Sequence, residues 1–492
     1  MMYQSTRDAS HKKYSAAEVI KMGLAPDGGL FIPESIPALT KDEITALCKD
    51  SYPVRAAKIL GKFLTDYTYE ELLSDCEAAY AESSFPGGAA PLVHIHDNIY
   101  SLELWHGPTA AFKDMALQIM PRLLSRAIVK TGETRDALIL VATSGDTGKA
   151  ALEGYKDIDR IKIMVFYPVD GVSRVQKLQM ATQTGGNVNV CAIRGNFDDA
   201  QTGVKKIFGD AEMAAKLADK GFVLSSANSI NWGRLAPQIV YYVSAYCDLL
   251  NKGALRMGET MDVCVPTGNF GNIFAGYIAK LMGLPVRHFV CASNKNNILT
   301  DFLRTGTYDR NRDFHLTMSP SMDILISSNL ERLLCFTAGE ERTAAYMESL
   351  KKDGAYTVDA EVLAAINENF SGYFADETAT AATIKAYFEG YDYLADTHTA
   401  VALSAAEQYV STLSDVRPMV VDSTASPYKF AADVYESLGK TQPADPLAAL
   451  DELAAVTNTE IPYPLRGLGQ REVRFTKVID AEEMPVAVLE WC

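Results

Sequence analysis

Several familiar patterns are missing from this chain of 492 residues. It has no Cys-x-x-Cys pair, and it has no run of about 18 apolar residues, the length that spans a membrane. The apolar stretch Ala236–Leu250 is better explained as a buried helix. The first residues are polar and basic, so we expect no secretory signal peptide. No repeat or low-complexity tract appears. We therefore expect a cytoplasmic protein without a membrane-spanning helix.

Cysteine and histidine are also placed without a metal-binding pattern. Three of the eight cysteines, Cys191, Cys264 and Cys291, lie in apolar runs, as buried thiols in a reducing compartment do. Among the seven histidines only His94 and His96 stand close together, and no further ligand is spaced to join them. We expect no metal site.

Positive charge is in deficit. The chain has 46 Lys and Arg residues against 62 Asp and Glu residues, a formal net charge of −16. This balance argues against nucleic acid or an anionic membrane as a partner. The hydrophobic content of 48% is ordinary for a globular enzyme. Because single cores stop growing beyond about 250–300 residues, we expect more than one domain.

One lysine stands out by its position. Lys113 directly follows Phe112, where a Gly-Pro turn gives way to an apolar-periodic stretch that begins at Met115. A helix start disfavours a cation, and this effect together with burial lowers the pKa of an amine toward the range in which it forms a Schiff base. The alternative is an ordinary solvated lysine on a helix.

A glycine-containing loop lies between a buried strand and an apolar helix. The strand is Val263–Pro266, the loop Thr267–Asn272 has the spacing Gly-x-x-Gly, and the helix runs from Ile273 to about Leu284. A helix start after such a loop binds phosphate through backbone N–H groups and the helix dipole. The spacing fits neither the Walker nor the dinucleotide pattern, so it favours a compact monophosphate over a nucleotide.

A second loop has similar surroundings. The apolar run Ala137–Val141 precedes Thr143–Gly148, and a helix follows from Lys149 to Tyr155. Hydroxyls, glycines and one Asp at a helix start offer donors for a carboxylate or phosphate. They also serve equally well as helix caps, because Ser, Thr and Asp are preferred there. Both alternatives stay open.

These motifs resemble those of threonine synthase, a fold-type II pyridoxal-phosphate enzyme. The resemblance is in order along the chain from residue 3 to about 430, and the long N-terminal segment favours the longer class found in many bacteria and fungi. The segments that carry it are Tyr3–Arg7, Gly23–Phe31, Gly107–Gln118, Ala142–Gly148, Asn228–Arg234, Thr267–Asn272, Ser319–Ile324, His398–Val401 and Ser423–Ala425.

The resemblance implies a set of cofactor contacts. Lys113 would hold pyridoxal phosphate as a Schiff base, with Phe112 beside the ring. Asp146 would lie near the ring hydroxyl and Thr424 at the pyridine nitrogen. Backbone amides would surround the phosphate, those of Gly268, Asn269, Phe270, Gly271 and Asn272. The family usually has His after the Thr-Ala pair, and Ser426 stands there instead.

The reaction implied is conversion of O-phospho-L-homoserine and water to L-threonine and phosphate, with Lys113 as the proton shuttle. Arg234 could grip one substrate anion bidentately. The other candidates for the two anionic groups are Ser144, Thr147, Asn228, Ser229 and Asn231. Alternatively, Asn228–Asn231 caps a long helix from about Arg234 to Leu250. Two rival functions remain: a related lyase that releases phosphate and yields an oxoacid, and a non-catalytic protein that has kept the fold.

The architecture expected is α/β, with parallel sheets flanked by helices in two lobes. Residues 1–90 form a mainly helical N-terminal domain, residues 91–450 the catalytic core, and residues 451–492 a C-terminal extension; a small mobile lobe of about 159–221 is inserted in the core. Residues 360–389 are expected to be mostly helical, and the protein a monomer or small homo-oligomer. The predicted strands are 99–104, 137–141, 161–167, 188–193, 263–265, 286–292 and 419–421.

Overall fold

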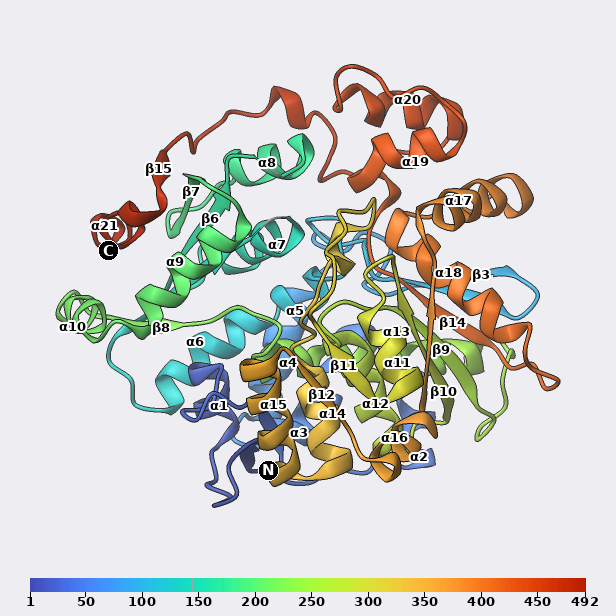
Figure 1. The fold of residues 1–492 in the computed structure, drawn as a ribbon, viewed down its shortest axis with the longest axis horizontal. Coiled ribbons are helices and arrows are strands. Elements are labelled where there is room, and N and C mark those ends of the chain that lie inside the picture. Colours follow the sequence, from blue (N-terminus) through green and yellow to red (C-terminus); the bar gives the residue numbers. More distant parts are fainter. Residues whose placement is uncertain (144, 171) are drawn as a thin grey trace.

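The computed structural model describes residues 1–143, 145–170 and 172–492. Two lobes are each built around a sheet, one of six strands and one of five, and helices flank both (Figure 1). All seven predicted strands are present. The α/β class with largely parallel sheets is therefore confirmed.

The six-stranded sheet forms the large lobe. Its neighbouring strands are parallel except Leu92–His96 and Ile99–Glu103, which pair antiparallel. Every residue of its two central strands is buried, which explains why most of their residues are apolar. Both strands end at the same edge of the sheet, where the predicted cofactor residues begin. In spatial order the strands are β13 (Phe370–Phe374), β10 (Val286–Ser293), β9 (Met261–Pro266), β14 (Met419–Ser423), β4 (Ile99–Glu103) and β3 (Leu92–His96).

The five-stranded sheet forms the small lobe and is wholly parallel. Side chains alternate between its two faces: Leu138 and Met164 pack against the outer helices, whereas Ile139 and Ile163 join the main core. In spatial order the strands are β15 (Val478–Asp480), β7 (Val188–Arg194), β6 (Ile161–Pro168), β5 (Asp136–Ala142) and β8 (Phe222–Ser225). The lobe is wider than the expected 159–221 segment, because β5 and β15 complete its sheet.

Helices cover both sheets. In the small lobe and at its base they are α5 (Asp114–Leu117), α6 (Met120–Lys130), α7 (Asp146–Tyr155), α8 (Arg174–Ala181), α9 (Phe197–Gly209) and α10 (Ala211–Asp219). In the large lobe they are α11 (Trp232–Asn251), α12 (Gly271–Leu281), α13 (Ile298–Thr305), η1 (Pro320–Met322), α14 (Leu330–Ala338), α15 (Glu340–Asp353), α16 (Ala360–Asn367), α17 (Glu377–Tyr391) and α18 (Thr397–Val410), with a small antiparallel sheet of β11 (Thr307–Asp309) and β12 (Ala355–Thr357).

The N-terminal region packs beneath the large lobe. Three of its helices begin with a capping box, in which a Ser or Thr and the Glu three residues later bind each other's backbone N–H: Ser15 with Glu18, Thr40 with Glu43, and Thr68 with Glu71. Its elements are β1 (Tyr3–Ser5), α1 (Ala16–Met22), β2 (Phe31–Pro33), α2 (Lys41–Leu47), α3 (Tyr52–Phe63) and α4 (Tyr69–Ala79).

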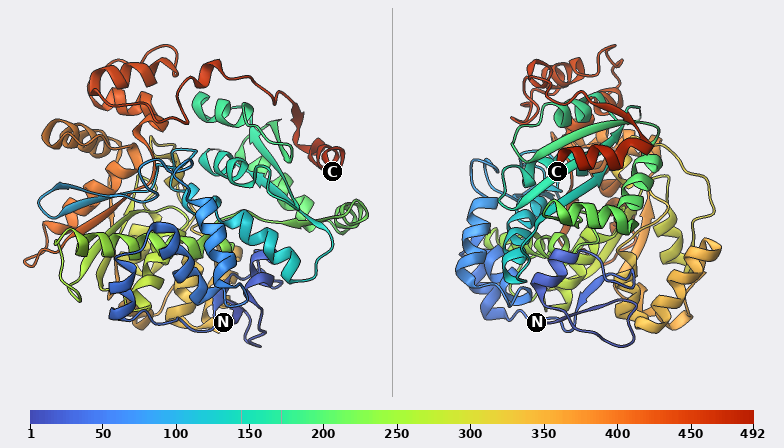
Figure 2. Two further views of the ribbon diagram at one scale, coloured as in Figure 1. Left: turned by 180° about the vertical axis from the view of Figure 1, so that it is seen from behind. Right: turned by 90° about the vertical axis from the view of Figure 1, so that its left-hand side faces the viewer.

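The C-terminal region links the two lobes. After β14 it forms η2 (Pro427–Phe430), α19 (Ala431–Ser437) and α20 (Ala448–Thr457), then crosses over the molecule to the small lobe (Figures 1 and 2). There β15 pairs with β7, and Arg474 donates to the carbonyls of Gln183 and Gly185 at 3.1 Å each. The remaining elements are η3 (Leu468–Gln470), η4 (Ala481–Glu483) and α21 (Met484–Trp491).

Residues 360–389 are mostly helical, as predicted, in α16 and most of α17, but a strand that the sequence did not predict lies between these two helices. Residues Phe370–Phe374 form β13, which pairs in parallel with β10 at the edge of the large sheet. The five residues have alternating burial, and Gly372 lies where a side chain would collide with the backbone of Thr300. Pairing with an existing strand decided this segment, because local periodicity over five residues is ambiguous.

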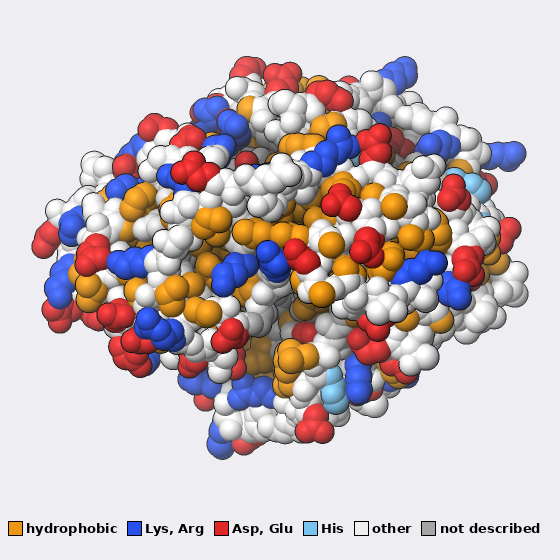
Figure 3. Space-filling view, turned by 90° about the horizontal axis from the view of Figure 1, so that it is seen from above, with side chains coloured by type: hydrophobic (Ala, Val, Ile, Leu, Met, Phe, Trp, Pro, Cys, Tyr) orange, Lys and Arg blue, Asp and Glu red, His pale blue; other side chains and the backbone are white. Residues whose placement is uncertain are grey.

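No helix among the described residues is long and apolar enough to cross a bilayer. On the face seen from above, acidic and basic side chains are interspersed around a central band of hydrophobic ones (Figure 3). Despite the net negative charge of the chain, this face therefore carries basic as well as acidic side chains.

Candidate active site

Lys113 lies at the start of α5, in a loop whose shape is fixed by Asp114. The carboxylate of Asp114 accepts hydrogen bonds from the backbone N–H of Thr109 at 2.8 Å and from its hydroxyl at 2.7 Å. Ala110 adopts a φ of 58°, a left-handed conformation that costs energy in a residue with a side chain. The loop is therefore held in a strained shape that presents the lysine.

A short antiparallel contact fixes Lys113 against the end of β14. The N–H of Phe112 donates to the carbonyl of Thr424 at 2.8 Å, and the N–H of Ser426 donates to the carbonyl of Ala110 at 3.0 Å. Ser426 also caps η2 through its hydroxyl. Ser426 thus has a structural role in joining the two segments. Among the described residues no hydrogen bond engages the hydroxyl of Thr424.

The amine of Lys113 is chemically unusual. Its side chain is half-buried, and Nζ lies 4.9 Å from the centre of the Phe112 ring. The pKa of Lys113 is lowered from its ordinary 10.5 to about 8, chiefly because burial desolvates the amine; Arg234 and Lys429 contribute to this shift, whereas Asp146 and Asp114 oppose it. An amine with a pKa near 8 is available both as nucleophile and as proton carrier near neutral pH.

The loop between β9 and α12 exposes backbone N–H groups. Its carbonyls are turned away: Ser327 donates to the carbonyl of Gly268 at 2.6 Å, and Asn329 donates to that of Asn269 from its backbone at 3.0 Å and its side chain at 2.9 Å. Within residues 1–143, 145–170 and 172–492 no acceptor binds the N–H groups of Gly268, Asn269 or Phe270. Those of Gly271 and Asn272 belong to the first helical turn, where N–H groups point outward.

Close packing explains the glycine at position 268. A Cβ there would lie 2.8 Å from the carbonyl oxygen of Ser321. Phe270 caps α12 with a left-handed φ of 60°. The loop is thus a cradle of free N–H donors at a helix start, which suits a phosphate.

A buried polar cluster supports this cradle from below. The carboxylate of Asp422, on β14, accepts from the side-chain amide of Asn272 at 2.9 Å and from the hydroxyl of Tyr242 at 2.8 Å. Tyr241 also donates to the Asn272 side chain. Burial raises the pKa of Asp422 to about 7. Sequence reasoning missed this cluster, since an Asp inside an apolar strand gives no local hint of its partner.

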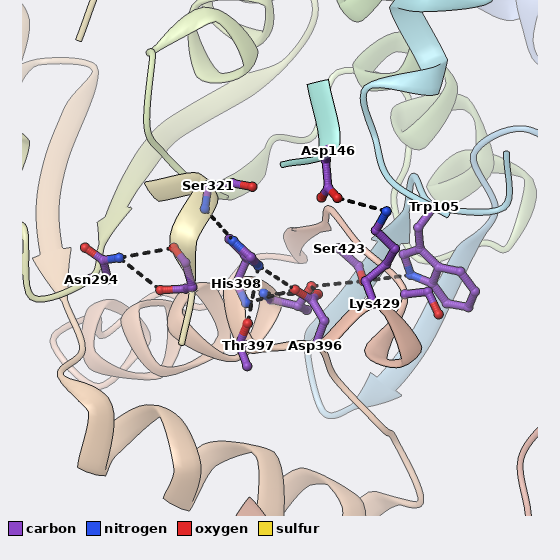
Figure 4. Close-up of polar contacts among 12 residues, drawn as sticks. Trp105, Asp146, Asn294, Ser321, Asp396, Thr397, His398, Ser423 and Lys429 are labelled. Atoms are coloured by element: carbon purple, nitrogen blue, oxygen red, sulfur yellow. Dashed lines mark hydrogen bonds and ion pairs between the residues drawn. The ribbon is translucent and has the colours of Figure 1, made fainter. Parts of the chain in front are cut away.

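A chain of hydrogen bonds connects the end of β14 with Ser321, in the η1 turn that packs against Gly268 of the cradle (Figure 4). The indole of Trp105 donates to the hydroxyl of Ser423 at 3.0 Å, and Thr399 links Ser423 to Asp396. Asp396 holds Nδ1 of His398 at 2.9 Å, and Nε2 of His398 accepts the backbone N–H of Ser321 at 3.1 Å. His398 therefore positions the turn that presses on Gly268. The His398–Val401 motif was noted in the sequence, but not this role.

The loop after β5 is closed by its own threonine. The hydroxyl of Thr143 accepts the N–H groups of Gly145 and Gly148 at 3.1 Å each. Asp146 and Thr147 follow in the first turn of α7, with Asp146 buried and Thr147 half-buried. Ser144, a predicted substrate ligand, lies outside the described residues.

The segment 228–234 brings Arg234 into the site. Arg234 is buried, donates to the carbonyl of Ala227 at 3.2 Å, and has no carboxylate partner among the described residues. Burial lowers its pKa to about 10. Asn231 caps α11, and its amide hydrogens bind the carbonyls of Ile20 at 2.9 Å and Ser226 at 3.2 Å.

The other two predicted residues of this segment are more open. Asn228 is exposed and Ser229 half-buried. The buried guanidinium of Arg332 connects the segment to the cradle, because it binds the carbonyl of Ile230 at 2.6 Å and the side chain of Asn329. Through Arg332 and Asn329, segment 228–234 is therefore connected by hydrogen bonds to the Gly268–Asn272 loop, which would hold the phosphate.

Taken as a donor set, the site fits a carbonyl cofactor that carries a phosphate. The lysine amine has a lowered pKa, and free N–H groups form a cradle that a Cβ at Gly268 would disrupt. No group of three His, Cys, Asp or Glu side chains in the described part of the chain could hold a metal ion.

Comparisons with known proteins give the same answer. Family models match three consecutive regions: Threonine synthase N terminus at residues 2–80, Pyridoxal-phosphate dependent enzyme at 85–421, and Threonine synthase, C-terminal at 399–487. A crystal structure of pyridoxal-phosphate-bound threonine synthase from Brucella melitensis superposes with a TM-score of 0.89 at 37% identity, covering 100% of this chain and 99% of that one.

Two curated relatives differ in length. Threonine synthase from Pseudomonas aeruginosa is 38% identical over 92% of this chain and 93% of its own. Human threonine synthase-like 1 is 39% identical over 86% of this chain, but the match spans only 58% of that longer protein. By its family models, its relatives and its fold, the chain belongs to the threonine synthase family of pyridoxal-phosphate-dependent enzymes.

Proposed function

We propose that the protein converts O-phospho-L-homoserine and water to L-threonine and phosphate. The observation that carries this proposal is Arg234: a buried guanidinium that has no carboxylate partner among the described residues and is close enough to Lys113 to lower the pKa of its amine. A buried cation left unpaired is costly, so it is retained where an anion will neutralise it. The similarity to Pseudomonas aeruginosa threonine synthase over nearly the full length of both chains supports the same reaction.

The reaction needs several proton transfers. The substrate would lose a proton from Cα and one from Cβ, phosphate would leave from Cγ, Cγ would gain a proton, and water would add at Cβ as a proton returns to Cα. When bound, the cofactor would supply an electron sink for these steps. Lys113 is the residue that would take and return the protons, and a pKa of about 8 suits both directions.

Two loops would bind the two anionic ends of the substrate. Arg234, with Asn228 and Ser229 beside it in sequence, would take the phosphate, because a guanidinium matches phosphate geometry through paired N–H donors. Thr147 would take the carboxylate at the start of α7, and the role of Ser144 stays a prediction from the sequence. Asn231 stabilises this arrangement as a helix cap.

Product analysis tests the proposal directly. Purified protein with pyridoxal phosphate is given O-phospho-L-homoserine in ¹⁸O-labelled water. We expect threonine and phosphate in equal amounts, with the label in the hydroxyl of threonine. An oxoacid with phosphate and no threonine would identify the rival lyase. No turnover by protein that binds the cofactor would support the non-catalytic alternative.

Two variants test the roles of the residues. Lys113→Ala should lose covalent cofactor and lower turnover by about 10³-fold or more, because both the attachment and the proton shuttle are gone. Arg234→Gln should raise KM by about 100-fold with the cofactor spectrum unchanged. Arg256→Gln, at an exposed position, is the matched control. An unchanged KM in Arg234→Gln would remove the basis of the proposal.

A further inference from the structure

A buried ion pair joins the two lobes beside the site. Nζ of Lys429, in η2 after the large-lobe strand β14, lies 2.8 Å from Oδ1 of Asp146, at the start of the small-lobe helix α7 (Figure 4). The side chains of Lys429 and Asp146 are 0% and 2% exposed. Charges so deeply buried are costly unless geometry and further hydrogen bonds compensate.

Helix α8 provides those hydrogen bonds. Gln176 donates to Oδ1 of Asp146 at 2.9 Å, and Gln179 accepts from Nζ of Lys429 at 2.7 Å. The two glutamines are three residues apart and therefore share one face of the helix. Gly145 leaves room for this face, since a Cβ there would lie 3.0 Å from Nε2 of Gln176.

The pair leaves one carboxylate oxygen available. Both donors act on Oδ1, and no other described residue donates to Oδ2 of Asp146. Asp146 and Lys113 are also close enough for each to shift the pKa of the other toward its charged form. The free oxygen therefore belongs to the site, not to the protein interior.

The chemistry of pyridoxal phosphate indicates what this oxygen would meet. The aldehyde that joins the lysine is flanked on the ring by the phosphate-bearing carbon and by the hydroxyl-bearing carbon. With the phosphate in the Gly268–Asn272 cradle of the large lobe, the hydroxyl flank would lie on the opposite side of the aldehyde carbon. Asp146, at the start of the small-lobe helix α7, is a buried carboxylate that could meet it there.

We propose that Lys429 is a positioning residue that reaches across the lobe boundary and, with Gln176 and Gln179, holds Asp146 ionised with one oxygen directed at the ring hydroxyl of the cofactor. An ionised carboxylate accepts a hydrogen bond, so it retains the proton on the ring oxygen. Lys429 acts only through Asp146. The inference depends on the cofactor and not on the proposed reaction, so the failure of either leaves the other standing.

A double-mutant cycle in purified protein tests this. Lys429→Met, Asp146→Asn and the double variant are measured for thermal stability without cofactor, for pyridoxal-phosphate affinity, and for the absorption spectrum of bound cofactor. Each single variant leaves one buried charge unpaired and should be destabilised. The double variant has no unpaired charge and should recover most of the stability.

The affinity for pyridoxal phosphate and the absorption spectrum distinguish a role in positioning Asp146 from a purely structural role of the ion pair. We expect the double variant to bind pyridoxal phosphate about tenfold more weakly and with a shifted absorption band, whereas Lys429→Arg keeps the wild-type band. Lys440→Met, at an exposed lysine, is the control. A stable double variant with wild-type affinity and spectrum would overturn the proposal. A double variant that fails to fold would also count against it, because neutralising both partners removes the buried charge.

Discussion

Two loops of this protein have the same sequence pattern but different hydrogen bonding. Thr143–Gly148 and Thr267–Asn272 both follow a buried parallel strand, both contain two glycines three residues apart, and both lead into a helix. In the second, neighbouring side chains bind the carbonyls of Gly268 and Asn269, which leaves N–H groups free for a phosphate. In the first, the hydroxyl of Thr143 consumes two of the loop's own N–H groups.

The difference shows that a glycine-containing loop binds an anion only if something else holds its carbonyls. Ser327 and Asn329 do so from more than fifty residues away in the sequence. The Thr143–Gly148 loop instead presents side chains, above all Asp146. The Thr267–Asn272 loop would therefore bind a ligand through its backbone N–H groups, and the Thr143–Gly148 loop through the carboxylate of Asp146.

The largest effect should come from closing the backbone cradle. In Gly268→Val the new Cβ collides with the backbone carbonyl of Ser321, which cannot turn aside, so we expect loss of pyridoxal phosphate on gel filtration and at least about 100-fold weaker binding. The matched change Gly145→Val meets the movable end of Gln176 and should weaken binding far less. Equal losses in both variants would erase the distinction between the loops.

The second prediction concerns the support under the cradle. Asp422 has a pKa of about 7 in the folded protein because of burial, against about 3.9 in an unfolded chain. The folded state holds this proton more tightly, so its contribution to stability is full below about pH 4 and is lost as pH rises through 7. The loss amounts to about 4 kcal/mol at most.

Urea unfolding of cofactor-free protein from pH 4 to 8 measures this contribution. Asp422→Asn should flatten the decline in unfolding free energy over that range. Asp114, whose pKa burial also raises to about 7, should account for part of the remaining slope and is tested by Asp114→Asn. An unchanged slope in Asp422→Asn would show that this carboxyl does not titrate as proposed.

The smallest effect should come from the loop that closes on itself. Thr143→Val keeps the shape but leaves the N–H groups of Gly145 and Gly148 without their acceptor, a cost of about 2 kcal/mol. Thr267→Val removes one bond to the carbonyl of Val265 and should cost about 1 kcal/mol or less. Measuring the free energy of unfolding of both variants tests this prediction. A larger decrease in Thr267→Val than in Thr143→Val would contradict it.

Much of the fold could be predicted from the sequence because apolar strands and capped helix starts are local signals. The strand at Ala137–Val141 and the long helix before Leu250 are of this kind. The strand at Phe370–Phe374 could not be found, since its five residues take their conformation from pairing with β10. The extent of the small lobe was missed for the same reason: β15 joins it from nearly 300 residues away.

The site divides in a similar way. Motif residues such as Lys113, Asp146 and Arg234 could be recognised from their residue types and positions in the sequence. The residues that hold the site in place could not, because Lys429, Asp396 and Asp422 look like ordinary charged residues in the sequence.

By itself, the sequence determined which residues could do chemistry here: a lysine beside a turn, two glycine loops and an arginine at the start of a long helix. Only the tertiary structure decided which loop keeps its N–H groups free and which charges face each other across the lobes. The reason is physical. Hydrogen-bond partners and burial come from distant segments, and these set the pKa and the availability of each group.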